Sequence, residues 1–388
     1  MRITRLFHEF FENLKGGVLL ILCTIISLLL ANSSFHETYL NLWHYQFAGL
    51  SIENWINDGL MAIFFLLIGL ELKREIYVGE LSNFKSASLP VFAAVGGMLI
   101  PAAIYAFFNY GTISQSGAGI PMATDIAFAI GVLSLLGNRV PTSLKVFLTA
   151  IAVIDDLGAI IVIAIFYTTS LSLINLFIVI GIFGILLLMN HLKIKYLVVY
   201  LIGGAAMWYF MLHSGVHATL AGILLAFAVP FGKGEESSLS HKWENALHKP
   251  VSSFILPVFA LANTAIFFGP GWDTGLATPG SMGIFAGLII GKPAGVVLFS
   301  FLAIVLGISV LPKGMKWKHI LGIGMLAGIG FTMSIFITLL AYNDDFLIRE
   351  SKISILLASL ISGAIGFLWL RHSLKKPTLK KIENNKRV

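Results

Sequence analysis

Residues 143–167 read SLKVFLTAIAVIDDLGAIIVIAIFY. Lys145, Asp155 and Asp156 are the only charged residues in this stretch, and so long an apolar run is typical of a helix that crosses a bilayer. A charge in the middle of such a helix costs at least roughly 2.5 kcal/mol. The adjacent aspartates therefore mark a membrane span that carries function.

The whole chain has the same apolar character. Of its 388 residues, 57% are apolar and 12% are charged, about half of the roughly 25% charge of soluble domains, which excludes a water-soluble globular protein. We expect an all-α polytopic membrane protein: a single transmembrane domain over residues 1–372 and a basic cytoplasmic tail over 373–388. The lone Cys23 excludes an intramolecular disulfide. The twelve transmembrane helices are expected near 17–32, 56–72, 88–109, 118–136, 143–167, 173–189, 196–211, 214–231, 250–268, 281–308, 319–341 and 353–371.

The basic residues predict how these spans are oriented. When alternate loops are assigned to one side, 23 of the 26 Lys and Arg residues fall there, Arg349 and Lys352 fall on the other side, and Lys292 lies inside a span. Loops rich in Lys and Arg face the cytoplasm, so both termini are predicted to be cytoplasmic. Because the basic residues are spread over many loops, they form no single patch for nucleic acid.

Two segments outside the spans carry expectations of their own. The first outer loop, about 33–55, has a strand-like stretch from Leu42 to Ile56 that Ala48-Gly49 interrupts, which predicts a hairpin. Such a hairpin could pair across a homodimer, and an amphipathic loop resting on the membrane surface fits equally well. The basic tail from Lys375 to Val388 could contact anionic membrane lipid.

Four ionisable residues lie where charge is expensive. Asp125 is in the fourth span, Asp155 and Asp156 are in the fifth, and Lys292 is midway along the tenth. One ammonium against three carboxylates leaves two negative charges unbalanced, and such carboxylates must take up protons or recruit a cation. This is the chemistry of a cation/proton exchanger. The alternative is a purely structural ionic cluster, which adjacent like charges would destabilise.

The ligand types narrow the choice of cation. Asp125, Asp156 and the hydroxyl of Thr124 supply hard oxygen ligands that suit sodium or lithium, so no cofactor and no transition metal is expected. Residues 155 and 156 are about 100° apart on a helix, so one can face a cavity and the other a neighbouring helix. Lys292 lies about twelve residues from either interface and is expected to pair with a carboxylate or with backbone carbonyls.

Two spans contain residues that break helices. Pro121 precedes Thr124 and Asp125 in the fourth span, and the glycines of the eleventh run up to Phe331-Thr-Met-Ser334. Both spans could unwind inside the membrane, although Gly324-x-x-x-Gly328 could instead serve close helix packing. Spans three to five, about 88–167, and ten to twelve, about 281–371, each place an interrupted helix centrally and run in opposite directions, which predicts inverted repeats.

Six motifs, in order, resemble the bacterial sodium/proton antiporter family NhaA over about residues 10–372. They are Phe64-Phe-Leu-Leu-Ile-Gly-Leu-Glu-Leu-Lys-Arg-Glu75, Ala123-Thr-Asp-Ile-Ala-Phe128, Ile154-Asp-Asp-Leu-Gly-Ala159, Ser214-Gly-Val-His-Ala-Thr219, Ile290-Gly-Lys-Pro293 and Gly328-Ile-Gly-Phe-Thr-Met-Ser334. The resemblance implies two discontinuous helices that cross near the membrane midplane, in a transporter of the bacterial inner membrane. It also implies electrogenic exchange of Na+ or Li+ for protons, activated at alkaline pH and serving sodium and pH homeostasis.

The same resemblance implies roles for single residues. Asp156 would be the main ion ligand and Asp155 its partner in ion and proton exchange, while Asp125 and Lys292 would compensate the half-helix ends and Thr124 would lie at the crossing. Asn245 departs from the histidine expected in many members, which affects the pH profile. The residues that match the family's pH response are Glu71, Arg74, Glu75, His217, Glu244 and His248. A solvated helix end for Glu71 to Glu75, and a hydrogen-bonded helix histidine for His217, are the alternatives.

Other classes of protein fit less well. An intramembrane aspartyl protease also needs two aspartates, but its Gly-x-Gly-Asp signature is absent and Asp155 and Asp156 lie on one helix. An enzyme is therefore not expected. A cation channel, or a symporter that moves an organic anion with sodium, is the better rival, and counter-movement of protons distinguishes an antiporter from both.

Overall fold

The computed structural model describes residues 2–168, 171–232, 238–269, 272–312 and 314–374, and the side chains of these except 2–15, 84, 85 and 138. Several residues used to predict the orientation fall outside this description, so the expectations for them stay predictions. They are the side chains of Arg2, Arg5, Lys15 and Lys85, and the residues Lys233, Lys313 and Lys375 to Val388.

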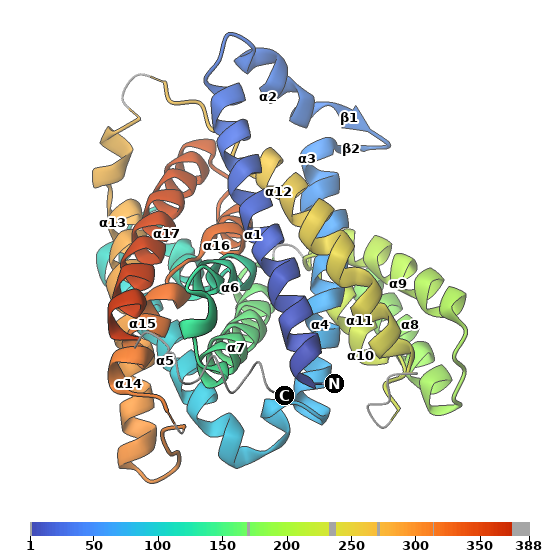
Figure 1. The fold of residues 1–388 in the computed structure, drawn as a ribbon. Helices are drawn as coiled ribbons and strands as arrows, with labels where there is room; N and C mark the ends of the chain where they lie inside the picture. Colours follow the sequence, from blue (N-terminus) through green and yellow to red (C-terminus); the bar gives the residue numbers. More distant parts are fainter. Residues whose placement is uncertain (1, 169–170, 233–237, 270–271, 313, 375–388) are drawn as a thin grey trace.

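The first half of the chain is helical apart from one short hairpin (Figure 1). Its elements are α1 (Arg2–Ala31), α2 (His36–His44), β1 (Gln46–Phe47), β2 (Leu50–Ser51), α3 (Ile52–Asn54), the π segment η1 (Trp55–Leu60), α4 (Met61–Tyr77), the 3-10 segment η2 (Glu80–Ser82), α5 (Phe84–Asn109), the 3-10 segment η3 (Gln115–Met122), α6 (Ile126–Ser134), the 3-10 segment η4 (Gly137–Arg139) and α7 (Thr142–Phe166).

The second half, as far as it is described, contains helices only. Its elements are α8 (Leu173–His191), α9 (Leu197–Leu212), α10 (Leu220–Ala228), α11 (Leu239–Pro250), the π segment η5 (Val251–Ile255), α12 (Leu256–Asn263), the 3-10 segment η6 (Thr274–Ala277), α13 (Pro279–Phe285), the π segment η7 (Ala286–Gly291), α14 (Lys292–Val305), α15 (Trp317–Ala327), α16 (Phe331–Ala341) and α17 (Asp345–Ser373).

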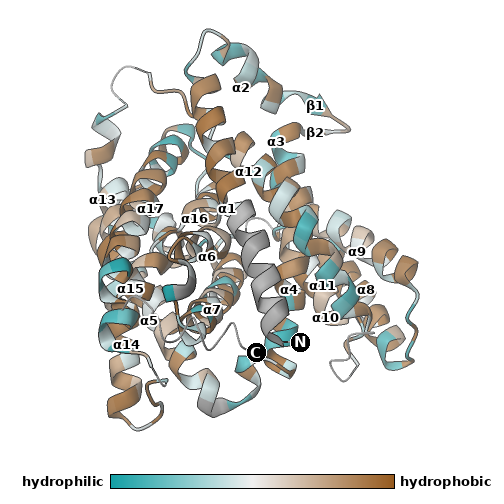
Figure 2. Ribbon diagram, viewed as in Figure 1, coloured by the Kyte–Doolittle hydropathy of each residue, from teal (hydrophilic) through white to brown (hydrophobic). Residues whose placement is uncertain are grey.

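Many of these helices have the length and composition of membrane spans. Seven helices among the described residues are long and apolar enough to cross a membrane, and there are nine if each of two bent helix pairs is one span. Figure 2 shows hydrophobic residues along the lengths of the helices, with hydrophilic residues more frequent towards their ends. The chain is therefore an α-helical, multi-pass membrane protein. The count of twelve helices and the inverted repeats stay predictions.

The hairpin predicted in the first outer loop exists, but its predicted length is wrong. β1 and β2 have two residues each and pair antiparallel, Gln46 with Ser51 and Phe47 with Leu50. Ala48 and Gly49 form the turn between them, with φ of 50° and 85°. The strand cannot continue to Ile56 because the Ser51 side chain accepts a hydrogen bond from the Asn54 N–H and starts a helix.

Two predicted spans also differ in extent. The span predicted at 214–231 contains a helix only from Leu220 to Ala228, because Gly215 has a φ of 82° and the residues before α10 form turns. The span predicted at 250–268 belongs to a helical run that begins at Leu239, where the Ser238 side chain caps α11, and that ends at Asn263. The turn at Gly215 delays the first of these helices, and the Ser238 cap starts the second, so the edges of the apolar runs do not set these boundaries.

The helix α14, which begins with Lys292, packs against α5 without side chains between the two backbones. A Cβ on Gly295 would lie 2.1 Å from the carbonyl oxygen of Gly96, and a Cβ on Gly96 would lie 2.3 Å from the carbonyl oxygen of Gly295. Such close approach requires glycine on both helices. The contact fixes the position of Lys292, three residues from Gly295.

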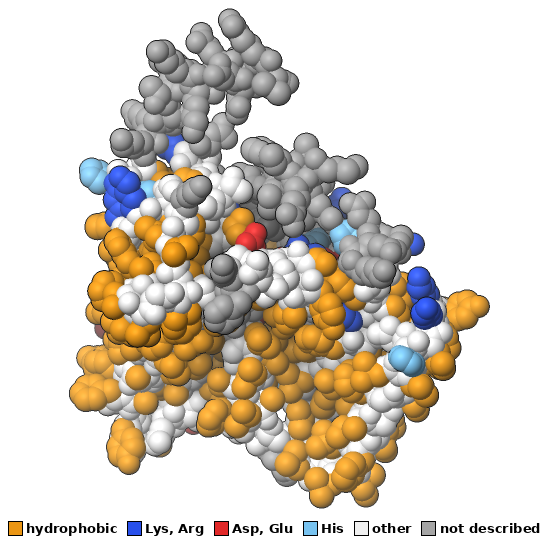
Figure 3. All heavy atoms as spheres, turned by 90° about the horizontal axis from the view of Figure 1, so that it is seen from below, with side chains coloured by type: hydrophobic (Ala, Val, Ile, Leu, Met, Phe, Trp, Pro, Cys, Tyr) orange, Lys and Arg blue, Asp and Glu red, His pale blue; other side chains and the backbone are white. Residues whose placement is uncertain are grey.

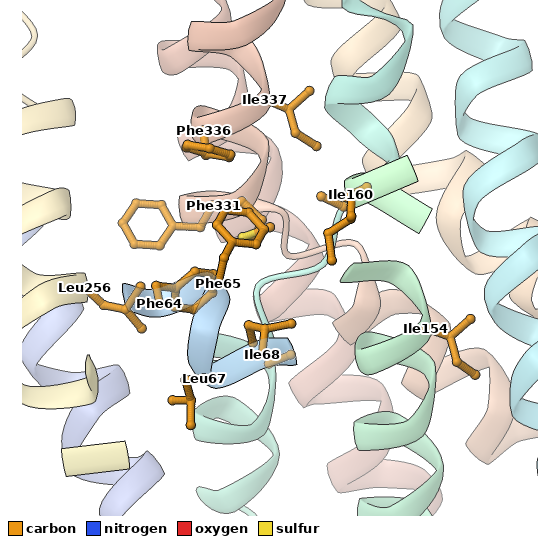
Figure 4. Packing of buried hydrophobic residues seen from close by; sticks show 14 of the residues in the cluster. Phe64, Phe65, Leu67, Ile68, Ile154, Ile160, Leu256, Phe331, Phe336 and Ile337 are labelled. Atoms are coloured by element: carbon orange, nitrogen blue, oxygen red, sulfur yellow. The ribbon is translucent and has the colours of Figure 1, made fainter. Parts of the chain in front are cut away.

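A hydrophobic core joins α4, α7, α12 and α16. In Figure 4, Phe64 and Phe65 of α4 lie towards Phe331 and Phe336 of α16, and the ring centres of Phe65 and Phe336 are 5.2 Å apart. These aromatic side chains are at most 4% exposed. Dense packing of this kind holds α16 against the body of the bundle just after the break that precedes it.

Replacing Gly295 by Ala tests the contact between α5 and α14. We expect a loss of roughly 1 to 3 kcal/mol in stability, because the new methyl group overlaps the Gly96 carbonyl oxygen and the helices must separate. Gly181→Ala is the control, since nothing lies within 4 Å of a Cβ there. Thermal unfolding in detergent measures both, and an unchanged midpoint for Gly295→Ala would contradict the contact.

Candidate ion-binding site

Two interrupted helices meet at their breaks. Between η3 and α6 the chain is extended over residues 123–125, and α15 and α16 are separated by 328–330 with a bend of 48°. The Asp125 N–H donates a hydrogen bond to the carbonyl oxygen of Ile329 over 2.7 Å, and the Ser334 hydroxyl donates to that of Ile120 over 2.7 Å. Each break thereby satisfies polar groups that the other leaves free.

The glycines predicted to permit the second break serve two purposes. A Cβ on Gly328 would lie 2.4 Å from the Leu288 carbonyl oxygen, and one on Gly330 would lie 2.1 Å from the Ser334 hydroxyl, so both positions of the break need glycine. Gly324, one turn earlier, packs against Pro293 of α14, where a Cβ would be 2.8 Å from the proline Cα. The break and the close packing offered as alternatives are therefore both present.

Asp125 caps two helices at once. Its Oδ1 accepts a hydrogen bond from the Phe128 N–H over 2.9 Å at the start of α6. Its Oδ2 accepts from the N–H and the hydroxyl of Thr332, over 3.1 and 2.5 Å, at the start of α16. The side chain is 2% exposed. One buried carboxylate therefore faces two helix N-termini, each of which carries roughly half a positive charge.

Asp155 forms a buried ion pair with Lys292. The lysine Nζ donates to Asp155 Oδ2 over 2.7 Å and also to the carbonyl oxygen of Met122, the last residue of η3. The expectation that Lys292 pairs with a carboxylate or with carbonyls is confirmed on both counts. The Thr124 hydroxyl lies 2.7 Å from the same Asp155 oxygen and 2.8 Å from the Ala327 carbonyl oxygen, and its single hydrogen can serve only one of them at a time.

Asp156 has a different environment from its neighbour. It is 1% exposed, and among the described residues neither of its carboxylate oxygens has a hydrogen-bond partner. Asp155 likewise keeps one oxygen, Oδ1, without a partner. The different environments follow from the angle of about 100° between successive residues of a helix. Three carboxylate oxygens are thus buried beside the helix crossing with no donor from the described residues.

A second charged cluster lies between the C-terminal part of α4 and the second half of α11. The Arg74 guanidinium contacts Glu244 (Nε to Oε1, 2.8 Å) and Glu75 (Nη1 to Oε1, 3.2 Å), and His248 Nε2 lies 3.3 Å from Glu71 Oε1 and 4.0 Å from Glu244 Oε1. Figure 3, a view from this end of the bundle, shows a small patch of Asp or Glu side chains at the surface, and Lys, Arg and His side chains scattered over the same face. Five of the six predicted pH-response residues are therefore in one network.

The sixth predicted pH-response residue lies elsewhere. His217 Nε2 is 3.0 Å from the carbonyl oxygen of Tyr167, which caps the end of α7. His217 precedes α10, whose Gly222 packs against Ala62 near the start of α4, so it lies towards the opposite end of α4 from Glu71. The structure does not bring His217 to the cluster. The histidine is hydrogen-bonded, as the alternative interpretation expects, but it lies before α10 and not in a helix.

Three polar residues that the sequence analysis does not single out support these sites. Thr332 donates twice to Asp125, and the Ser359 hydroxyl of α17 accepts the Phe331 N–H at the start of α16. Lys73 is 4% exposed and donates to the carbonyl oxygens of Ala226, Phe227 and Val229 at the end of α10. Thr332 lies within one of the quoted motifs, but only the fold shows what it contacts.

Broken helices that cross at buried carboxylates, inside a multi-pass helical bundle, are typical of secondary transporters of ions. The chain matches the family described as Na+/H+ antiporter 1 over residues 8–370, and it belongs to that family. The resemblance drawn from the motifs is thereby confirmed. This family is itself a standard example of the class.

Curated relatives match almost the whole chain. Na(+)/H(+) antiporter NhaA 1 of Flavobacterium johnsoniae is 61% identical over 375 residues, which cover 96% of this chain and 98% of that protein. Na(+)/H(+) antiporter NhaA of Flavobacterium psychrophilum is 60% identical over 381 residues, 98% of this chain and 99% of the relative. Na(+)/H(+) antiporter NhaA of Dechloromonas aromatica is 57% identical over 374 residues, 95% and 96% of the two chains.

Glu244 is expected to change its charge near neutral pH. Burial, together with the charge of Glu71, raises the pKa of its carboxyl to about 7 against the opposing effects of Arg74 and His248. The protonated form therefore predominates below pH 7, and the stabilisation that it gives the fold is lost as pH rises through 7. Difference infrared spectra should show a protonated-carboxyl band that disappears with a midpoint near pH 7.

Glu244→Gln should lack this component, whereas Glu37→Gln, which changes an exposed carboxyl, should retain it. The same midpoint in Glu244→Gln as in the parent protein would show that another group titrates.

Proposed function

We propose that the protein is a sodium/proton antiporter in which Asp156, with Asp155 beside it, exchanges the two ions. The observation that carries the proposal is the buried Asp156 carboxylate, neither of whose oxygens has a hydrogen-bond donor in the part of the chain that the structure describes. A buried carboxylate is stable when it is protonated or when a cation neutralises it, and is costly otherwise. Its two stable states are therefore those that an antiporter alternates between.

The charges around the crossing support this assignment. The Lys292 ammonium neutralises Asp155 at 2.7 Å. The two helix N-termini capped by Asp125 contribute roughly one positive charge between them, which balances the second carboxylate. Among the described residues, Asp156 is the carboxylate of the crossing with no hydrogen-bond donor. Sodium or lithium, as hard cations, would find oxygen ligands on Asp156, on the free Oδ1 of Asp155 and on the Thr124 hydroxyl.

Competition between the cation and protons then gives coupled exchange. Protonated carboxyls at Asp155 and Asp156 cannot bind sodium, and bound sodium excludes the protons. If the site opens to one side of the membrane at a time, each sodium ion that leaves on one side is exchanged for protons that enter from the other. The two broken helices, which are hydrogen-bonded to each other at Asp125, would move together in this step.

The finer features of the proposal rest on the family and the sequence. We propose twelve membrane spans with inverted repeats at about 88–167 and 281–371, both termini in the cytoplasm of a bacterium, and location in the inner membrane. Exchange would be electrogenic, would accept Na+ or Li+ and would serve sodium and pH homeostasis. The protein would not be an enzyme and would need no cofactor. A homodimer through the first outer loop, and contacts with membrane lipid, belong to the same proposal.

Activation at alkaline pH is proposed to act through the charged cluster of Glu71, Arg74, Glu75, Glu244 and His248. The pKa of Glu244, about 7, supports this because its carboxyl gains a negative charge over the range in which activation is expected. The ionised Glu244 would attract Arg74 and repel Glu71, which alters how α11 lies against α4. His217 would act separately, through its contact with the end of α7.

Exchange should be lost when Asp156 is replaced by Asn. The amide has the same shape but can neither ionise nor neutralise sodium, so we expect at least a 100-fold lower rate with a normally folded protein. Sodium should collapse a preformed acid-inside pH gradient in everted vesicles that contain the parent protein, and should fail to do so with Asp156→Asn. Asp345→Asn, an exposed aspartate at the start of α17, is the matched control. Sodium-dependent collapse by Asp156→Asn would refute the site assignment.

Electrogenic exchange should respond to the membrane potential. If more protons than sodium ions cross per cycle, each cycle moves net charge, and the potential that builds up slows further turnover. Sodium-driven pH changes in proteoliposomes should therefore be several-fold faster with valinomycin and equal potassium on both sides than without valinomycin. Equal rates in the two conditions would indicate electroneutral exchange, and transport without proton movement would favour a channel or a symporter.

A further inference from the structure

A buried carboxylate lies near the start of α17, which begins towards the end of the bundle where α2 lies (Figure 1). Glu350 is 6% exposed. Among the described residues, no Lys, Arg or His side chain lies within ion-pair distance of it, whereas Asp155 has Lys292. The mechanism proposed above does not use Glu350.

Oxygen atoms surround this carboxylate. The hydroxyls of Thr278 and Ser281 both donate to Glu350 Oε1, the second over 3.1 Å. The same two hydroxyls lie 3.0 and 2.7 Å from the carbonyl oxygen of Gly275, and the Ser354 hydroxyl donates to that of Ser281 over 2.8 Å. A carboxylate, hydroxyls and a backbone carbonyl are the ligand types that hard cations prefer.

Two members of this group of oxygens, but not the hydroxyls of Thr278 and Ser281, also line a cavity. Glu350 and Gly275 line a cavity of about 250 Å³ whose other walls include Phe267, Trp272 and Phe346. A water molecule takes up about 30 Å³ in the liquid, so the cavity has room for a cation with several waters of hydration.

One cation already lies at the cavity. Arg349 is exposed, lines the same space and has its guanidinium carbon 5.9 Å from the centre of the Phe346 ring. Its positive charge repels any second cation, so binding beside Glu350 must be weak. Weak binding suits a site from which a transported ion has to leave.

We propose that Glu350 Oε1, the hydroxyls of Thr278 and Ser281 and the carbonyl oxygen of Gly275 form a second binding site for Na+ or Li+, at the end of the bundle that is predicted to face the outer solution. This inference rests on the proposed antiport. It places the site at one end of the bundle only, so its effects depend on the side from which sodium is supplied.

The test measures the KM for sodium separately from each side. Right-side-out vesicles expose the outer end to the medium, and everted vesicles expose the cytoplasmic end. Glu350→Gln removes the charged ligand, so the outer KM should rise at least about tenfold while the cytoplasmic KM changes less than twofold. Arg349→Gln removes the repelling charge, so the outer KM should fall about two- to fivefold. Glu37→Gln, an exposed carboxyl of the same end, should leave both values unchanged.

Each other outcome overturns the inference. If Glu350→Gln changes neither KM, or changes both equally together with thermal stability, Glu350 only holds α13 against α17. Should Glu350→Gln fail to fold, Ser281→Ala keeps the carboxylate and removes one ligand, and an unchanged outer KM would then refute the site. A parent protein that exchanges no sodium in either orientation refutes the antiport itself, and active parent protein without the asymmetry refutes only the second site.

Discussion

The carboxylate of Asp125 is the interaction on which the rest of the site depends. Interrupting a helix exposes N–H groups, and two interruptions at one place would leave two positively polarised helix ends facing each other. Asp125 accepts hydrogen bonds from both, through Phe128 on one side and Thr332 on the other. The negative charge of Asp125 attracts both helix N-termini. The two interrupted helices can therefore cross at their breaks.

Once Asp125 is engaged in this way, the adjacent aspartates acquire separate roles. Lys292, which directly follows the π segment η7, is held near Asp155 because α14 lies directly on α5 at Gly96 and Gly295. Its ammonium then has one carboxylate partner and one carbonyl. Among the described residues, Asp156, one residue further along α7, has no hydrogen-bond donor, neither from Lys292 nor from Thr124. Two identical side chains thus differ because of what packs against them.

The sequence predicts the class of fold and the buried charges well, because both follow from energies that act on single residues. An aspartate inside an apolar run is costly wherever it occurs, so Asp125, Asp155, Asp156 and Lys292 can be recognised without a structure. The sequence predicts the pairing of Lys292 with Asp155 only in part. The length and charge of the lysine side chain indicate a carboxylate partner, but they do not indicate which of the three carboxylates it is. The contacts of Thr332 and Ser359 depend on the crossing itself.

Helix boundaries explain the remaining errors, and they matter for function. Hydropathy ends a span where polar residues begin, so Lys73 and Glu350 are assigned to loops just beyond spans predicted at 56–72 and 353–371. In the structure α4 continues to Tyr77, and α17 already begins at Asp345 because Asp344 caps the N–H groups of Phe346 and Leu347. That aspartate is a start signal the sequence does contain. A count of buried charges that uses only the spans predicted from hydropathy therefore omits buried charged side chains at the ends of the helices, such as Lys73 and Glu350.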